Sequence, residues 1–270
     1  MRFIVAGILC LFSILARAGT VDTVHVYSRS MKKNIPCIIV KPDVNSESKK
    51  KLSTLYLLHG YGGDYLTWLK RDRELTRYAD EHQIIIVCPD GGPHSSYIDN
   101  PIDPTDQFET FIAIELPAFV DSNYNTSGSR RSRAIAGFSR GGHGALYLAW
   151  RHANTFGAAG SMSGALIVRT LTKTQLRKLK KGEAVVPEES GNYSFLTEVE
   201  TPCSHALSII IDCGLQDPIL DMSRAAHLKL LQLNIPHDYI ERPGRHDFAY
   251  WRNAIKFQLL FFSNYFNRDN

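Results

Sequence analysis

The stretch AIAGFSRGGHG, residues 134–144, places a serine between glycines where an apolar run changes into a glycine-rich segment of helical character. Ser139 lies at the centre of GFSRG, residues 137–141, which is a G-x-S-x-G pattern. A nucleophile elbow needs such glycines, because the chain turns so sharply from strand to helix that larger side chains would clash. The pattern is weak by itself, but an apolar strand-like RAIAGF precedes it and a helical GGHGALYLAW follows. This context favours a catalytic serine over a polar turn.

The beginning of the chain has the features of an export signal. MRFIVAGILCLFSILARA, residues 1–18, has a short basic start, an apolar run too brief for an ordinary membrane span, and the small-x-small site Ala16-Arg17-Ala18. We therefore predict a signal peptide at 1–18, cleavage after Ala18 and a periplasmic or extracellular protein. An uncleaved anchor is the alternative.

The mature part, residues 19–270, has the composition of one large globular domain. The chain is 44% hydrophobic and 21% charged, and loss of the two arginines in the signal lowers the net charge from +4 to +2. This modest charge does not indicate a nucleic-acid partner. We expect no stable membrane insertion once the signal is cleaved, and the oligomeric state stays open. The remaining cysteines do not have the spacing of a metal site, and the sequence leaves any disulfide pairing open. They are Cys37, Cys88, Cys203 and Cys213.

Apolar strand-like runs alternate with helical patterns after an initial hairpin, which predicts an α/β fold with a mostly parallel eight-stranded sheet flanked by helices. The predicted strands are Thr23–Arg29, Pro36–Val40, Thr54–His59, Gln83–Cys88, Arg133–Phe138, Phe156–Met162, Leu207–Cys213 and His237–Glu241. The predicted helices are Arg71–Glu81, Phe108–Asp121, Gly142–His152, Pro218–Leu233 and Phe248–Phe266. The polar, basic segment from Val168 to Glu200 has no strand pattern, and we interpret it as a small cap inserted over the edge of the sheet.

A serine hydroxyl is a weak nucleophile near neutral pH, so the site needs a base on the same edge of the sheet. His246 fits, because RPGRHDFAYW is a glycine-containing loop between the last predicted strand and the last predicted helix. The acid should lie between Ser139 and His246, since α/β-hydrolases run in the order Ser, Asp or Glu, His. IIIDCGLQDPIL offers Asp212 at the strand end and Asp217 in the loop beyond it. We favour Asp217, although an Asp before Pro218 is also an ordinary helix start.

Acyl transfer also requires donors for the oxyanion that forms when the hydroxyl attacks. One is expected to be the backbone N–H of Arg140, directly after the serine. The other is assigned to Tyr61 in LLHGYGGDYLTW, a glycine-rich loop after the third predicted strand. Aromatic residues beside these loops can form a substrate platform or simply pack the loops. Besides Tyr61, the candidates are Trp68, Tyr97 and Trp251.

Four separated pieces of the chain carry a resemblance to a known family. LLHGYGGDYLTW, AGFSRGGHGALYLA, DCGLQD and RPGRHDFAYW resemble the putative-esterase group of α/β-hydrolases. That group includes tributyrin, feruloyl and acetyl-xylan esterases, S-formylglutathione hydrolase and the mycobacterial mycolyltransferases. GGPHSSYIDNP and FETFIAIELPAFVDSNY are similar to the tributyrin and feruloyl subgroup, so the likeness spans nearly the whole mature chain. One departure is Arg140, where many relatives carry an apolar residue.

The resemblance implies the triad Ser139, Asp217 and His246 in a secreted serine esterase that needs no metal or organic cofactor. Its substrate is expected to be a short-acyl or hydroxycinnamoyl ester, either a small molecule or linked to polysaccharide, because the polar cap segment has few apolar residues to line a tunnel for a long acyl chain. Two alternatives use the same fold. An acyltransferase of the mycolyltransferase type would pass the acyl group to an alcohol, and a non-catalytic binding protein would use the fold without chemistry.

Overall fold

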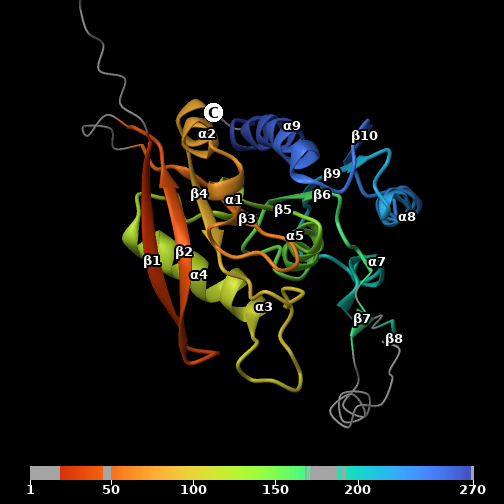
Figure 1. Ribbon diagram of the computed structural model, residues 1–270, viewed down its shortest axis with the longest axis horizontal. Coiled ribbons are helices and arrows are strands. Elements are labelled where there is room, and N and C mark those ends of the chain that lie inside the picture. Colours follow the sequence, from red (N-terminus) through yellow and green to blue (C-terminus); the bar gives the residue numbers. More distant parts are fainter. Residues whose placement is uncertain (1–18, 45–49, 168, 171–187, 190–192, 269–270) are drawn as a thin grey trace, which may run out of the picture.

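The computed structural model describes residues 19–44, 50–167, 169–170, 188–189 and 193–268, and a twisted eight-stranded sheet forms its centre (Figure 1). The strand order is β1-β2-β4-β3-β5-β6-β9-β10. The first two strands form an antiparallel hairpin, β2 is antiparallel to β4, and all later pairs are parallel. The strands are β1 Thr20–Ser28, β2 Lys33–Lys41, β3 Ser53–Leu58, β4 Ile84–Pro89, β5 Arg133–Phe138, β6 Ala158–Met162, β9 Ser208–Gly214 and β10 Asp238–Arg242.

Each of the eight predicted strands is present with bounds within three residues of those expected, and the predicted α/β-hydrolase architecture is confirmed. The main helices are α1 Thr67–Arg71, α2 Leu75–His82, α4 Leu116–Asn123, α5 Arg140–Arg151, α8 Leu220–Gln232 and α9 Phe248–Phe266. The short helical elements are α3 Phe108–Thr110, a π-helical turn Phe111–Glu115, a 3₁₀ turn Arg130–Ser132 and α7 Phe195–Glu198.

One predicted helix, Arg71–Glu81, is wrong as a single element. Helix α1 ends at Arg71, and α2 begins only at Leu75. Asp72 between them has an extended backbone, with φ −128° and ψ 102°, and its carboxylate accepts the N–H of Glu74. An aspartate that bonds to the backbone two residues ahead favours a turn over a continuous helix.

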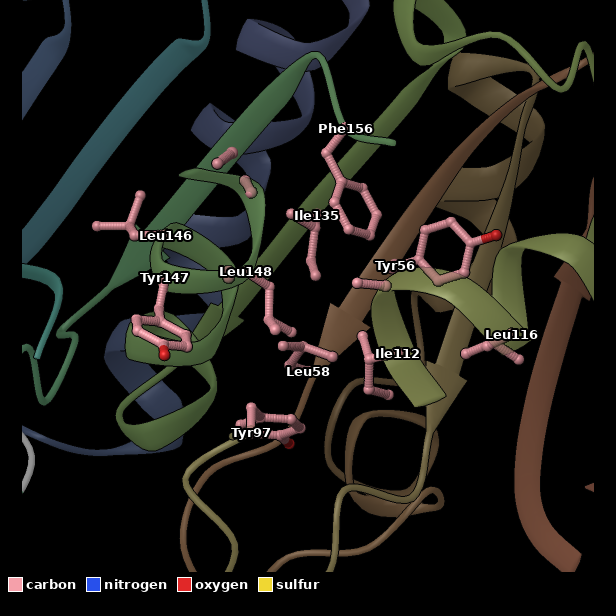
Figure 2. Packing of buried hydrophobic residues seen from close by; sticks show 14 of the residues in the cluster. Tyr56, Leu58, Tyr97, Ile112, Leu116, Ile135, Leu146, Tyr147, Leu148 and Phe156 are labelled. Carbon is pink, nitrogen blue, oxygen red and sulfur yellow. The ribbon is translucent and has the colours of Figure 1, made fainter. Parts of the chain in front are cut away.

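Helices cover both faces of the sheet, so inner strands such as β4 and β5 are buried on both sides, as in other parallel sheets, whereas the edge strands β1 and β10 stay partly exposed. One face packs on the π-helical turn, α4, α5 and α8, and Figure 2 shows Ile112 beside Leu58 of β3, with Leu116 on the side of Tyr56. The other face packs on α1, α2 and α9, and Figure 1 shows α2 and α9 together at the top of the view. This arrangement leaves the carboxyl ends of the parallel strands, and the loops that follow them, as the place for a site.

The predicted signal peptide lies outside the described residues, as does most of the predicted cap. Of the cap, the structure describes an antiparallel pair, β7 Arg169–Thr170 with β8 Glu188–Glu189, and the segment from Tyr193 onward. His143 of α5 donates from Nε2 to the carbonyl of Tyr193 at 2.8 Å, which fixes the end of the cap to the domain. No helix within the described ranges is long and apolar enough to cross a membrane. The four described cysteines are free thiols.

Candidate active site

Ser139 occupies a strained turn at the carboxyl end of β5, near the middle of the sheet. Its φ of 53° and ψ of −120° lie in a region that non-glycine residues rarely adopt. A Cβ on Gly137 would come within 2.5 Å of the Gly141 backbone, and a Cβ on Gly141 within 2.5 Å of the His59 carbonyl oxygen. Both glycines are therefore required by close backbone approach. The turn is held by a hydrogen bond from the Ser139 N–H to the Met162 carbonyl at 2.9 Å.

Three side chains from different loops meet at this turn. His246 Nε2 lies 2.9 Å from Ser139 Oγ, and His246 Nδ1 lies 2.8 Å from Asp217 Oδ2. A carboxylate oxygen can only accept, so Nδ1 carries the proton and Nε2 is left to accept the serine hydroxyl. The loops that carry the acid and the base are bonded to each other, because the Gln216 N–H donates to the Gly244 carbonyl at 2.9 Å. The arrangement is that of a serine nucleophile, a base and an orienting acid.

The structure distinguishes the two aspartates that the sequence left open. Asp217 is 6% exposed, and its second oxygen accepts the Ile219 N–H at 2.9 Å. Burial would raise the pKa of Asp217, but the hydrogen bonds that the carboxylate accepts, first of all from His246, outweigh burial and lower the pKa. Asp212 instead is fully buried, accepts the Tyr250 hydroxyl and pairs with Arg242. Asp217 is therefore the carboxylate that contacts the histidine.

The two backbone N–H groups expected to bind an oxyanion are free to do so. Within the described part of the chain, neither the Tyr61 N–H nor the Arg140 N–H has a hydrogen-bond acceptor in the protein. Arg140 is the first residue of α5, and N–H groups in a first helical turn have no intrahelical partner. The loop of Tyr61 is held in place by the Gly62 N–H, which donates to the Pro93 carbonyl at 2.8 Å. Such unpaired donors beside the nucleophile are what a tetrahedral oxyanion requires.

A cavity of about 490 Å³ opens at Ser139 and His246. Trp251 is part of its wall, with its ring 4.2 Å from that of Phe138 and 5.0 Å from that of His246. Sequence reasoning missed several other lining residues, although Phe248 stands only two positions after the histidine in the motif that located it. The lining consists of Tyr61, Gly62, Gly63, Asp64, Thr67, Lys70, Arg71, Phe138, Ser139, His246, Phe248 and Trp251.

Two aromatic residues expected to contact substrate lie in the core instead, so that expectation is wrong for Trp68 and Tyr97. Each is 1% exposed. Trp68 donates from Nε1 to the Leu58 carbonyl at 3.0 Å, and the Tyr97 hydroxyl donates to the His59 carbonyl at 2.8 Å. His59 is itself 1% exposed and accepts the Gly91 N–H through Nε2 at 2.9 Å. These buried contacts support the loops around the cavity from below.

Comparisons with known proteins identify the family of this chain. The family model described as "Putative esterase" matches residues 28–262. The chain belongs to this family. It is thus a carboxylic ester hydrolase, and it is 25% identical to the acetyl esterase of Caldicellulosiruptor saccharolyticus over 255 residues, which are 86% of this chain and 94% of that one. A solved ferulic acid esterase superposes with a TM-score of 0.78 at 25% identity, over 92% of this chain and 99% of that one.

A second likeness is to mycobacterial antigens, and it covers a smaller share of the chain. The MPT51/MPB51 antigen of Mycobacterium bovis is 30% identical over 168 residues, which are 62% of this chain and 52% of the antigen. The structure of Mycobacterium tuberculosis MPT51 superposes with a TM-score of 0.73 at 18% identity, over 92% of this chain and 99% of that one. At that identity, the superposition shows a shared fold.

Arg140, the departure from the family pattern, has a side chain that turns away from the cavity. Its Nη1 donates to the His94 carbonyl at 2.6 Å, and its guanidinium lies 4.4 Å from the ring centre of Tyr61. The Tyr61 ring also lies 5.1 Å from the His94 ring and is 63% exposed. Arg140 therefore ties together the two loops at the cavity rim and supports an exposed aromatic surface, rather than placing a charge beside the serine.

Proposed function

We propose that this esterase hydrolyses short-acyl or hydroxycinnamoyl esters through a Ser139–His246–Asp217 triad. The observation that carries the proposal is the pair of hydrogen-bond contacts, at 2.9 and 2.8 Å, that join the three side chains in that order. A weak nucleophile is activated when a base lies within hydrogen-bond reach and a third group orients the base.

The reaction proceeds in two halves. Ser139 Oγ attacks the ester carbonyl while His246 Nε2 takes the hydroxyl proton, and the Tyr61 and Arg140 N–H groups stabilise the oxyanion. Collapse of this intermediate releases the alcohol, which receives the proton from His246, and leaves an acyl-serine. Water then attacks the acyl group with His246 as base, and the serine and the carboxylic acid are released. Asp217 stabilises the imidazolium in both halves.

The cavity supports a small or flat acyl group. Phe138, Phe248 and Trp251 form an aromatic wall beside the serine, and the exposed ring of Tyr61 stands at the rim. Aromatic faces bind other rings and the apolar faces of sugars. An acetyl esterase and a ferulic acid esterase are among the similar proteins, so acetyl and feruloyl esters are the first substrates to test.

Export belongs to the same proposal, with cleavage after Ala18. The Gly19 N–H donates to Asp80 Oδ2 at 2.9 Å, so cleavage would place a new positively charged amino group directly against a carboxylate. N-terminal sequencing of the protein recovered from the culture medium or periplasm tests this: a chain that begins at Gly19 supports it, and a chain that retains residues 1–18 contradicts it.

The decisive experiment for the chemistry is Ser139→Ala, assayed with 4-nitrophenyl acetate, butyrate and palmitate and with methyl ferulate. We expect turnover to fall on the order of 10⁶-fold, and labelling by a fluorophosphonate probe to disappear from the intact mass. Ser122→Ala is the matched control, because Ser122 is an exposed serine of α4 that bonds only to its own helix at the Ala118 carbonyl. Labelling that persists in Ser139→Ala, or palmitate as the best substrate, would overturn the proposal. Product analysis with an added alcohol separates hydrolysis from acyl transfer.

A further inference from the structure

A second groove, of about 880 Å³, adjoins the active-site cavity between α1, the start of α2 and the first two turns of α9. The groove and the cavity share Lys70, Arg71 and Phe248 as lining residues. A molecule bound with its ester at Ser139 can therefore continue into this groove without leaving the surface. The lining consists of Lys70, Arg71, Asp72, Arg73, Glu74, Tyr78, Phe248, Ala249, Arg252, Asn253 and Lys256.

The charge of this groove is strongly positive. Two acidic residues also line it. Glu74 is paired with Arg77 of α2. Asp72 is 2% exposed, and the attraction of Arg252 partly opposes the rise in its pKa that burial causes, so two anions stand against five cations in the groove. Within the described residues, no carboxylate forms an ion pair with any of the five basic side chains of the groove. Those five, all exposed, are Lys70, Arg71, Arg73, Arg252 and Lys256.

The basic groups form a row that starts at the cavity and leads away from it. The Arg71 guanidinium lies 4.6 Å from the ring centre of Phe248, at the boundary of the two spaces. Arg252 and Lys256 are four residues apart and so share one face of α9. From Ala249 to Lys256 the helix rises about 10 Å, which is longer than one sugar ring. Guanidinium and ammonium groups that have no carboxylate in an ion pair attract the carboxylates of a ligand when they stand in such a row. A guanidinium can bind one carboxylate through two hydrogen bonds.

We propose that this groove binds the carboxylates of an acidic oligosaccharide whose esterified sugar lies at Ser139, so that the substrate is an ester on a uronate-bearing polysaccharide. The inference rests on the proposed esterase function and names its substrate class. The anion belongs to the alcohol side of the ester, because the groove leads outward along the surface of α9 and has room for more than one charged ring. Exposed charges contribute mainly to substrate binding, and salt screens them.

The test compares an acetylated oligogalacturonide with a neutral acetylated xylo-oligosaccharide, with 4-nitrophenyl butyrate as the small neutral reference. The variant is the double substitution Arg252→Gln, Lys256→Gln. The matched control is Lys51→Gln, Arg268→Gln, which removes the same charge from a basic recess at the opposite edge of the sheet, where the parallel strands begin. All four side chains are exposed, so both double variants are expected to fold.

We expect the groove variant to lose about tenfold in kcat/KM on the acidic oligosaccharide, mainly through KM, and to keep its activity on the two neutral esters within about twofold. The control variant should keep all three activities. For the unsubstituted enzyme, raising NaCl from about 0.05 M to about 0.5 M should lower kcat/KM on the acidic substrate alone. Equal losses on acidic and neutral substrates, or an acidic substrate that is no better than the neutral oligosaccharide, would overturn the inference.

Two further measurements distinguish an anionic acyl group from an anionic alcohol group and the groove proposal from the esterase function itself. If 4-nitrophenyl hemisuccinate loses activity in the groove variant and the oligogalacturonide does not, the groove binds an anionic acyl group and the assignment to the alcohol side is wrong. If 4-nitrophenyl butyrate is not hydrolysed by the unsubstituted enzyme, or is hydrolysed equally by Ser139→Ala, the proposed function fails first. If instead the enzyme is active and the groove variant hydrolyses acidic and neutral substrates as the unsubstituted enzyme does, only the proposal about the groove is wrong.

Discussion

Replacing Asp217 by asparagine tests the geometry of the site with a change of a single atom. Both carboxylate oxygens of Asp217 are acceptors: one takes the Ile219 N–H at 2.9 Å and the other takes Nδ1–H of His246 at 2.8 Å. An asparagine amide has only one acceptor. If its oxygen stays on the Ile219 N–H, its NH₂ faces His246 Nδ1, and the imidazole must move its proton to Nε2. The proton then points at Ser139 Oγ, and the base can no longer accept.

We expect Asp217→Asn to lower kcat about 10⁴-fold, equivalent to about 5 kcal/mol of transition-state stabilisation, with KM nearly unchanged. The assay is hydrolysis of 4-nitrophenyl butyrate at neutral and alkaline pH, normalised to folded protein by circular dichroism. Asp212→Asn is the comparison, because that carboxylate pairs with Arg242 and Tyr250 rather than with the histidine. We expect Asp212→Asn to lower the free energy of unfolding while leaving kcat, normalised to folded protein, nearly unchanged. A loss below about tenfold in Asp217→Asn, or a larger loss in kcat for Asp212→Asn, would refute the reasoning.

Two further predictions follow from buried and rim residues. Burial lowers the pKa of His143 to about 4, whereas an unfolded chain has a histidine pKa of about 6.5. As pH falls, the unfolded state therefore binds a proton before the folded state does, and the free energy of unfolding decreases below about pH 6.5. Between pH 7 and pH 5, urea titrations should show that the unsubstituted protein loses about 2 kcal/mol more of this free energy than His143→Gln does. Equal slopes would contradict this. Arg140→Met should lower kcat/KM for methyl ferulate by about fivefold and leave kcat/KM for 4-nitrophenyl acetate nearly unchanged. The backbone N–H donor of residue 140 stays in this variant, whereas the Tyr61 ring loses the guanidinium that supports it. Equal effects on both esters would assign no selectivity to Arg140.

The sequence by itself determined the eight strands of the sheet, most of the helices and the identity of the turn that carries the serine. Strand β5 and helix α9 begin and end at the predicted residues, because a buried parallel strand is a continuous apolar run and α9 is bounded by the loop of His246 and the end of the apolar pattern. The glycines around Ser139 were predictable from the motif, because a nucleophile elbow leaves no room for side chains next to the serine. For Gly137 the nearest excluding atoms belong to the turn itself, whereas for Gly141 they belong to the backbone at Leu58 and His59.

Only the tertiary structure decided which side chains meet. Asp212 and Asp217 are both acidic residues at the end of the same strand, and their separation depends on Arg242 and Tyr250, which come from β10 and α9. Trp68 and Tyr97 lie beside the right loops, yet the loops fold their rings inward, where buried carbonyls accept their N–H and O–H groups. The cationic groove combines residues of α1 with residues of α9 that are nearly 180 positions later in the chain. Local pattern determines an element and its faces, whereas a side chain's partner depends on packing between distant segments, and a single sequence carries no direct signal for that packing.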